Sequence, residues 1–421
     1  MSSASILTAY EQRSYDVTPH LFPVDTKHKI YLDHHATTPI DPRVLEAMLP
    51  FLKYEFGNAS STHCFGVSAQ QSVNNARRHV ASLFAAEQND VIFTSGATES
   101  NNLAIKGFAF ANKSKGRHII TSLVEHNSIL NTCRYLETQG FTVTYLTVDR
   151  NGSVSTDQLN SMIRKDTILC TLGAANNEIG TIQDIKTIGA LCKERNVALH
   201  VDAAQSAGKL PIDIEEQGID MLSISAHKMY GPKGIGALLI KNHPKKIALT
   251  PQIHGGDQES GLRSGTLPVH LVVGFGAAAS ITDYTECERI TAMRELLWKI
   301  LKSGSLICKR NGDAERTLPG TLSVTINEPG FIKIKAALLN IAVSSKSACS
   351  SAGTHPSHVL KAIGLSDLEA QRTVRFGIGR GNSESDIKFV GAEILKAFDK
   401  VLPYHLLAPI YLEGVPSSGE G

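Results

Sequence analysis

The feature that most constrains the fold is an alternation of short β-rich runs with helical stretches, from roughly residue 70 to residue 240. Helical spacing fills intervals such as Ser128–Gln139 and Ile185–Arg195. This order is typical of an α/β protein with a mostly parallel sheet, in which ligands bind at the carboxyl ends of the strands. The runs that we predict to be strands are Val91–Ser95, His118–Ser122, Thr142–Val148, Thr167–Asn176, Val197–Gln205, Asp220–His227 and Ile235–Ile240.

The alternation of strands and helices stops near Gly255, in the polar, glycine-rich stretch HGGDQESGLRSGTLPVH. A helical stretch follows from about Val273 to Ser303, and then a strand–helix–strand–helix order. We therefore predict a second, smaller domain. The predicted parts are an N-terminal extension (1–29), a large ligand-binding domain (30–272), a small C-terminal domain (273–405) and a tail (406–421).

Composition narrows the class of protein. The chain has 421 residues, of which 42% are hydrophobic and 19% charged, and its formal net charge is +2. These values fit a globular enzyme and give no support to nucleic acid or a membrane as the main partner. The first thirty residues lack the apolar core of a secretory signal. Seven scattered cysteines without a CxxC pair indicate reduced thiols, so we expect a cytoplasmic protein.

Lys228 stands where an apolar run meets a glycine-rich turn, in SISAHKMYGPKG. A surface lysine in a turn is the ordinary interpretation. Small residues precede it, and His227 is its neighbour. A lysine in a tight, partly desolvated loop can react with an aldehyde, which is the functional interpretation.

A second candidate is the turn Ser95-Gly96-Ala97-Thr98, between a predicted strand and a helix that we expect to begin at about Glu99. Free N–H groups at a helix start, with a threonine hydroxyl nearby, can cradle a phosphate. An ordinary strand–helix loop with a capping hydroxyl is the alternative.

Two further residues follow strand ends. Asp202, in HVDAAQS, either caps the next helix or pairs with the ring nitrogen of a pyridine cofactor. His126, in SLVEHNSIL, either stacks on a flat cofactor or is structural, and this stretch alone does not decide. A phosphate cup, a carboxylate, a stacking ring and a reactive lysine together describe a site for pyridoxal phosphate.

The order of motifs resembles the class V aminotransferase-like cysteine desulfurases, in the branch that includes the iron–sulfur-cluster and nitrogenase-associated enzymes. The similarity runs from about residue 30 to residue 400. It implies a fold-type-I architecture, with a mostly parallel seven-stranded sheet in the large domain, a smaller α+β domain, and a homodimer. The motifs that carry it are YLDHHATTPIDPRV, FTSGATESNNLAIKG, VEH, NNEIG, HVDAAQS, SAHKMYGPKGIGAL, RSGTLPVH, AVSSKSACSSAG and VRFGIGR.

Cys349 matches the nucleophilic cysteine of this family. It lies in SSKSACSSAGTHPSH, a run of small hydroxyl residues, whereas an ordinary free cysteine is buried among aliphatic side chains. The resemblance implies that Lys228 moves the Cα proton of L-cysteine and that His126 assists. Cys349 then takes the sulfur as a persulfide, alanine leaves, and an acceptor protein such as a cluster scaffold or thiolation enzyme receives the sulfur.

The resemblance also assigns contacts to other residues. Asn177 and Gln205 are expected at the cofactor ring, and Asn177 and Arg375 at the substrate. The residues expected at the phosphate are Ala97, Thr98, Ser225, His227 and, from the other subunit, Thr266.

Some residues fall outside this pattern. Adjacent His34 and His35 point in different directions and have no further ligand at suitable spacing, so we predict no metal site. Lys346 stands where the family has glycine, and its cation either favours the Cys349 thiolate or is simply solvated. His355 and His358 near Cys349 either tune the thiolate or are ordinary loop residues.

Three rival functions keep the same fold. A class V aminotransferase needs no cysteine in a loop of small residues, so Cys349 argues against it. A selenocysteine lyase stays open. A scaffold that binds pyridoxal phosphate without catalysis conflicts with the joint presence of Lys228, Asp202, His126 and Cys349.

Overall fold

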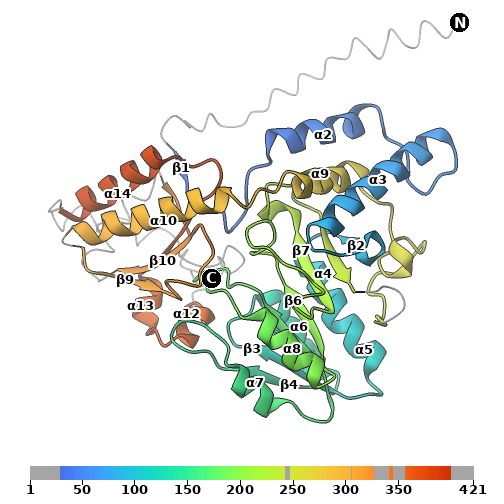
Figure 1. Ribbon diagram of the computed structural model, residues 1–421, viewed down its shortest axis with the longest axis horizontal. Coiled ribbons are helices and arrows are strands. Elements are labelled where there is room, and N and C mark those ends of the chain that lie inside the picture. The colour runs from blue at the N-terminus through green and yellow to red at the C-terminus, as the bar shows by residue number, and fades with distance from the viewer. Residues whose placement is uncertain (1–28, 242–246, 305, 327–340, 345–355, 400–421) are drawn as a thin grey trace, which may run out of the picture.

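The computed structural model describes residues 29–241, 247–304, 306–326, 341–344 and 356–399. It consists of a large layered α/β part and a smaller α+β part beside it (Figure 1). Cys349 and Lys346 lie outside the described residues, as do His355, the predicted extension and the predicted tail.

All seven predicted runs form strands of one sheet, in the order β2-β8-β7-β6-β5-β3-β4. Except in the edge strand β4, their residues are almost all buried, which explains why the sequence shows them as largely apolar runs. The strands are β2 (Val91–Thr94), β3 (His118–Ser122), β4 (Thr142–Leu146), β5 (Thr167–Gly173), β6 (Ala198–Asp202), β7 (Met221–Ser225) and β8 (Gly236–Ile240).

The sheet is mostly parallel. Strands β4, β3, β5, β6 and β7 pair in parallel, whereas β8 is antiparallel to both β7 and β2. Strands β2 to β7 therefore end at the same edge of the sheet, which confirms the predicted α/β class and fixes where a ligand can bind.

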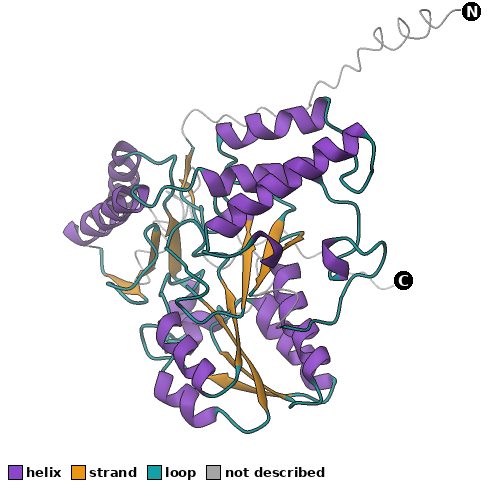
Figure 2. Ribbon diagram, turned by 45° about the vertical axis from the view of Figure 1, so that its right-hand side comes forward, coloured by secondary structure: helices purple, strands orange, loops and turns teal. Residues whose placement is uncertain are grey.

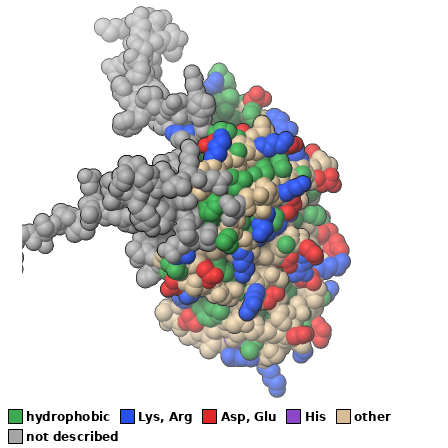
Figure 3. Space-filling view, turned by 90° about the vertical axis from the view of Figure 1, so that its left-hand side faces the viewer, with side chains coloured by type: hydrophobic (Ala, Val, Ile, Leu, Met, Phe, Trp, Pro, Cys, Tyr) green, Lys and Arg blue, Asp and Glu red, His purple; other side chains and the backbone are tan. Residues whose placement is uncertain are grey.

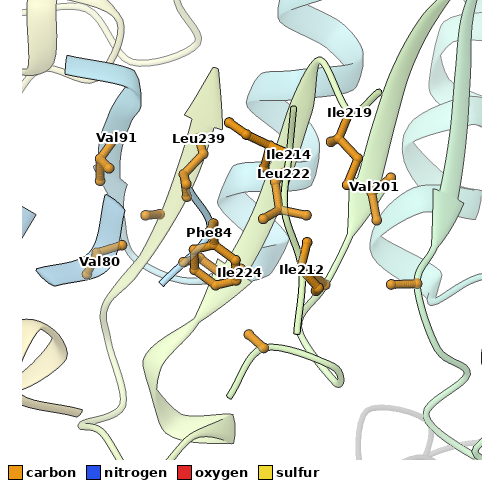
Figure 4. Close-up of a cluster of buried hydrophobic side chains, with 14 of the residues drawn as sticks. Val80, Phe84, Val91, Val201, Ile212, Ile214, Ile219, Leu222, Ile224 and Leu239 are labelled. Carbon is orange, nitrogen blue, oxygen red and sulfur yellow. The ribbon is translucent and has the colours of Figure 1, made fainter. Parts of the chain in front are cut away.

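Helices cover both faces of this sheet (Figure 2). On one face, α3 (Cys64–Ser82), α8 (Ile185–Glu194) and α9 (Val269–Ser280) pack on the strands. Phe84 and Phe275, both fully buried, belong to this cluster, and Figure 4 shows Phe84 among the side chains of β7 and β8. On the other face, one helical run packs with α6 (Asn127–Thr138); the run comprises α4 (Ala97–Asn102), a π-helical turn (Leu103–Gly107) and α5 (Phe108–Asn112).

Several helices begin at a side-chain cap. Asp41 accepts from Arg43 N at the start of α2 (Pro42–Lys53), and Ser155 accepts from Gln158 N at α7 (Thr156–Met162). His126 caps α6 through Nδ1, which accepts from Ser128 N. Such caps satisfy otherwise orphan N–H groups. The cap at α6 also fixes the position of a predicted catalytic ring.

The smaller part contains an antiparallel sheet ordered β12-β10-β9, from β9 (Cys308–Asn311), β10 (Thr321–Ile326) and β12 (Thr373–Gly377). Helices α10 (Glu286–Ser303) and α14 (Glu384–Asp399) pack on each other and on this sheet. The first described strand, β1 (Ile30–Tyr31), pairs with β11 (Ile341–Ala342). Helices α12 (His358–Ala362) and α13 (Asp367–Gln371) instead contact Val124 and Ile179 of the large part.

The helical stretch predicted from about Val273 to Ser303 consists of two helices, α9 and α10. The chain turns between them where Asp283 Oδ1 accepts hydrogen bonds from the backbone N–H and the hydroxyl of Thr285. The predicted domain boundary after residue 272 falls within α9, which packs along its length on α2 and α3. The division into domains stays a prediction.

No helix among the described residues is long and apolar enough to cross a bilayer. On the face drawn in Figure 3, acidic and basic side chains are interspersed where the surface is described.

Helix α9 approaches α3 closely at Gly276, where a Cβ atom would lie 2.5 Å from Ala76 Cα. We expect Gly276→Ala to force the helices apart and to lower the free energy of unfolding by about 1–3 kcal/mol, the usual cost of overpacking. Urea unfolding of the variant measures this cost. Gly381→Ala is the matched control, since a Cβ there meets nothing within 4 Å. Equal stability of the two variants would contradict the prediction.

Candidate active site

A cavity of about 370 Å³ lies where β2, β3, β5, β6 and β7 end, and Arg375 from β12 completes its wall. Most of the predicted site residues line this cavity. They are Ala97, Thr98, His126, Asn177, Asp202, Gln205, Ser225, His227, Lys228 and Arg375. Thr266 does not line it and is exposed on the surface.

The segment before α2 holds Lys228 in place. Lys228 Nζ donates to the carbonyls of His35 and Ala36, the latter at 2.9 Å. Thr38 Oγ1 donates to the His227 carbonyl and accepts from Tyr230 N. The amine is therefore aimed by backbone contacts from a segment nearly two hundred residues away.

The end of the cavity that Lys228 and Lys233 line is rich in positive charge. Lys209 Nζ donates to the Gln205 carbonyl at 3.0 Å, and burial together with the charge of Lys228 lowers the pKa of Lys209 to about 7. Burial and the charges of Lys228, Lys233 and Lys209 lower the pKa of His227 to about 4. His227 is thus neutral at physiological pH, and the surrounding lysines favour an anion.

The predicted phosphate turn opens onto the cavity. Helix α4 begins at Ala97, two residues earlier than the sequence predicts, and Gly96 before it has φ of 152°. A Cβ at Gly96 would lie 3.6 Å from Ser225 Oγ, so glycine leaves open the space between the turn and that hydroxyl. The turn is braced by Glu99, which accepts from Ser95 N and from Arg263 Nε.

Asp202 ends β6 and is 8% exposed. Its Oδ1 accepts from Ala204 N at 2.9 Å and its Oδ2 from Asn101 Nδ2 at 2.7 Å. Each carboxylate oxygen has two acceptor sites, so both can take a further donor. Asp202 therefore both begins the next turn, as the capping interpretation requires, and faces the cavity.

Arg375 reaches the cavity from the smaller part. Its Nη1 donates to the Asn177 carbonyl at 2.7 Å and its Nη2 to Asp33 Oδ1 at 2.8 Å. Its Nε is buried and has no hydrogen-bond partner among the described residues. Arg375 lines the cavity, and a guanidinium at a cavity wall suits a carboxylate ligand.

The described residues on either side of the segment that carries Cys349 both lie at this site. Ser344 is hydrogen-bonded through its backbone to Arg375 in both directions. After the segment, Ser357 donates to Glu178 Oε2, and His358 Nε2 lies 2.9 Å from the Glu125 carbonyl, to which it can donate. The chain thus leaves the described fold beside Arg375 and re-enters it beside His126.

Comparison with known proteins shows which family the chain belongs to. The family model described as Aminotransferase class-V matches residues 30–390. The chain belongs to the class V aminotransferase family. The cysteine desulfurase IscS of Shewanella sp. (strain W3-18-1) is 47% identical over 394 residues, which is 92% of this chain and 96% of that protein. The IscS of Salmonella paratyphi B is 46% identical over 392 residues, with the same coverage.

Solved structures of this family resemble the chain throughout. A NifS-like protein has a TM-score of 0.80 and 35% identity, covering 87% of this chain and 98% of its own. SspA, solved in complex with cysteine, has a TM-score of 0.77 and 42% identity, covering 83% of this chain and 98% of its own. These matches place the chain in the cysteine desulfurase branch of the class V aminotransferases, as predicted.

Enzymes of this family are pyridoxal-phosphate dependent, and the cavity fits that cofactor. The open space at Gly96, with Thr98, Ser225 and His227 around it, suits the phosphate. Asp202 has acceptor capacity for a protonated ring nitrogen, and Lys228 supplies an amine for the aldehyde. The chain is therefore a pyridoxal-phosphate enzyme.

Sequence reasoning missed several residues of the site. His35, dismissed as a metal ligand, lines the cavity and lies 3.2 Å from Gln205 Oε1 through its Nδ1. Among the described residues, no group of three or more His, Cys, Asp or Glu could hold a metal ion. Lys209 and Glu125 were also missed, although Glu125 precedes His126 in the VEH motif and gave a local signal.

Glu125 is wholly buried at the cavity wall. Ser122 Oγ lies 2.6 Å from its Oε1, and Gly173 N donates to its Oε2 at 2.7 Å. Burial, with a smaller contribution from Asp202, raises the pKa of Glu125 from its ordinary value to about 7. The folded protein therefore holds this proton more tightly than the unfolded chain does.

This difference predicts a pH-dependent stability. Glu125 contributes most below its unfolded pKa, and the contribution is lost as the pH rises through about 7. Glutamine mimics the protonated acid, so Glu125→Gln should match the wild type near about pH 5 and exceed its free energy of unfolding by about 3 kcal/mol near about pH 8. Urea midpoints of the cofactor-free proteins at both values test this, and a pH-independent difference would contradict it.

Proposed function

We propose that the chain is a pyridoxal-phosphate-dependent cysteine desulfurase, which converts L-cysteine to L-alanine and passes the sulfur through Cys349 to an acceptor. The observation that carries this proposal is the convergence of Lys228, Asp202, His126 and Arg375 on one cavity. Two residues of its wall, Arg375 and Glu125, also contact the described residues that precede and follow the Cys349 segment. The cysteine desulfurases named above and the cysteine complex of SspA support it.

The residues of the chain divide the reaction between them. When bound, the cofactor supplies an electron sink for the substrate carbon. Arg375 binds the substrate carboxylate through its guanidinium, and the contact with Asp33 holds that group in orientation. Lys228 would hold the aldehyde of the cofactor in the resting enzyme, and its free amine would move the Cα proton of the substrate.

Sulfur transfer is the step that Cys349 performs. Its thiolate attacks the substrate sulfur, so that an S–S bond forms and the Cβ–S bond breaks. The electron pair of the broken bond passes to the substrate carbon, which is then protonated to give alanine. Cys349 keeps the sulfur as a persulfide until an acceptor thiol takes it.

We propose a homodimer because one surface is apolar and one predicted site residue is remote. Helix α2, the loop after it and the first turn of α3 expose large hydrophobic side chains, and Phe56 stacks on Phe65 with ring centroids 5.5 Å apart. The exposed set is Leu45, Leu49, Leu52, Tyr54, Phe56, Phe65 and Val67. Thr266 is likewise exposed, as a residue offered to the partner's phosphate site would be.

The acceptor and the compartment complete the proposal. Cluster scaffolds and thiolation enzymes are the acceptors that we propose, since both receive sulfur from a protein persulfide. We propose the cytoplasm because the six described cysteines are all free thiols.

The sulfur-transfer step predicts a sharp effect of one substitution. With L-cysteine, the wild type should release alanine and gain the mass of one sulfur atom. Cys349→Ala should bind substrate but lose the persulfide and at least about 99% of alanine release, because no nucleophile remains. Intact mass spectrometry and alanine assay measure both.

Cys64→Ala is the control, since Cys64 is an exposed free cysteine far along the chain from the site. A keto acid as the product, or unchanged turnover in Cys349→Ala, would favour the aminotransferase instead.

The dimer proposal predicts that charge on the α2 surface blocks association. Leu45→Glu with Leu49→Glu places two carboxylates on one face of α2, where the native side chains are 45% and 37% exposed. We expect a monomer by sedimentation, with cofactor bound at least about tenfold more weakly because Thr266 of the second copy is lost. Leu368→Glu, at 53% exposure on α13, should remain dimeric. A double variant that stays dimeric would overturn the proposed surface.

A further inference from the structure

One buried amide joins two separate parts of the cofactor site. Asn101 lies on α4 and is fully buried. Its Nδ2 donates to Asp202 Oδ2 at 2.7 Å and to Ser128 Oγ at 2.8 Å. An amide nitrogen has two protons, so its donor capacity is fully used.

The orientation of this amide is set by its partners. Asn101 Oδ1 is buried and has no hydrogen-bond partner among the described residues. Turning the amide over would place that oxygen against the Asp202 carboxylate, acceptor against acceptor. Burying an oxygen without a hydrogen-bond partner costs free energy of folding. The favourable polar contacts of Asn101 are therefore the two hydrogen bonds that its Nδ2 donates.

The second partner leads to the catalytic ring. Ser128 Oγ lies 2.8 Å from His126 Nδ1, which also accepts from Ser128 N at 3.1 Å. Because Nδ1 accepts from the backbone, it carries a lone pair, and because Ser128 Oγ already accepts from Asn101, its own proton is free to go to Nδ1. The ring proton then sits on Nε2.

We propose that Asn101 and Ser128 are positioning residues that hold Asp202 and the Nε2-protonated tautomer of His126 in one arrangement. The chain of donors runs from Asn101 Nδ2 to Ser128 Oγ and from the Ser128 hydroxyl to His126 Nδ1, while the second Asn101 proton orders Asp202. The carboxylate at the cofactor ring nitrogen and the ring stacked on the cofactor are thereby set by the same amide. This inference rests on the pyridoxal-phosphate site of the proposed function.

The first test measures cofactor binding. Asn101→Leu removes a donor to a charged carboxylate, so the dissociation constant for pyridoxal phosphate should rise by about ten- to a hundredfold. Asn112→Leu is the matched control: Asn112 is also a buried amide, but its Nδ2 donates to the carbonyls of Phe108 and Ala248, outside the cavity. That variant should lose stability and keep cofactor affinity within about twofold. Equal loss of affinity in both variants would overturn the role of Asn101.

The second test concerns the tautomer. Ser128→Ala removes the donor to His126 Nδ1 and leaves Asn101 bonded to Asp202. Since the donated bond favours the neutral ring, its loss should move the acidic limb of the pH profile of kcat upward by about 0.5–1 unit, and the pH titration of the bound cofactor's visible absorption with it. Ser128→Thr, which restores a hydroxyl, should return both toward the wild type.

The two variants together decide the link. In the Asn101→Leu/Ser128→Ala double variant, both quantities are measured again: the free-energy change of cofactor binding and the shift in the pH titration. Each should change by less than the sum of the changes in the two single variants, because both substitutions act on one chain of hydrogen bonds. Additive shifts, or an unmoved titration in Ser128→Ala, would overturn the proposal, and the Ser128 arm decides alone if Asn101→Leu does not fold. The absorption and affinity measurements need no turnover, so they stand even if no alanine is formed and the desulfurase proposal fails.

Discussion

The parallel pairing of β3, β5, β6 and β7 is the constraint on which the rest of the structure depends. Gly173 pairs with Asp202, and Asp202 with Ser223, so the last residues of β5 and β6 lie level with a residue near the end of β7. Each strand then delivers a different group into the same cavity: His126 after β3, Asn177 after β5, Asp202 from β6 and Lys228 after β7. A slip of one residue in any pairing would turn the strand's buried side chains to the wrong face and displace its active group.

A second constraint joins the two parts of the molecule. The segment around His35 pairs with the small sheet through His34 N and Gly377 O, and holds the lysine turn through the carbonyls of His35 and Ala36. Asp33 of the same segment pairs with Arg375. Since one short segment contacts both the substrate-binding guanidinium and the reactive amine, the distance between these two groups is set locally, although they come from different sheets.

The sequence predicts the sheet well because nearly every strand residue outside β4 is buried. Buried strands are composed mainly of apolar residues, so they can be recognised in the sequence as apolar runs. The break between α9 and α10 escaped prediction because it depends on a local cap at Asp283 within a stretch of helical spacing. Ten of the twelve predicted site residues line the cavity, since each follows a strand end or a family motif. Asn101 lies within the motif FTSGATESNNLAIKG, but nothing in the motif distinguishes it from an ordinary helical residue, and its partner Asp202 is 101 residues away.

The ionisable groups buried in and beside the cavity together determine its charge. Lys209 and Glu125 both have a pKa of about 7, one lowered and the other raised by burial. At neutral pH, each of these two groups is therefore charged in only a fraction of the molecules. Lys228 and Lys233 also line the cavity, and the anionic phosphate and the substrate carboxylate complement their positive charges. Burial of these groups without a ligand costs stability, and a ligand that binds only the folded state offsets that cost. The cation-rich cavity is consequently a poor structural core and a strong anion site, which is what a phosphate-bearing cofactor requires.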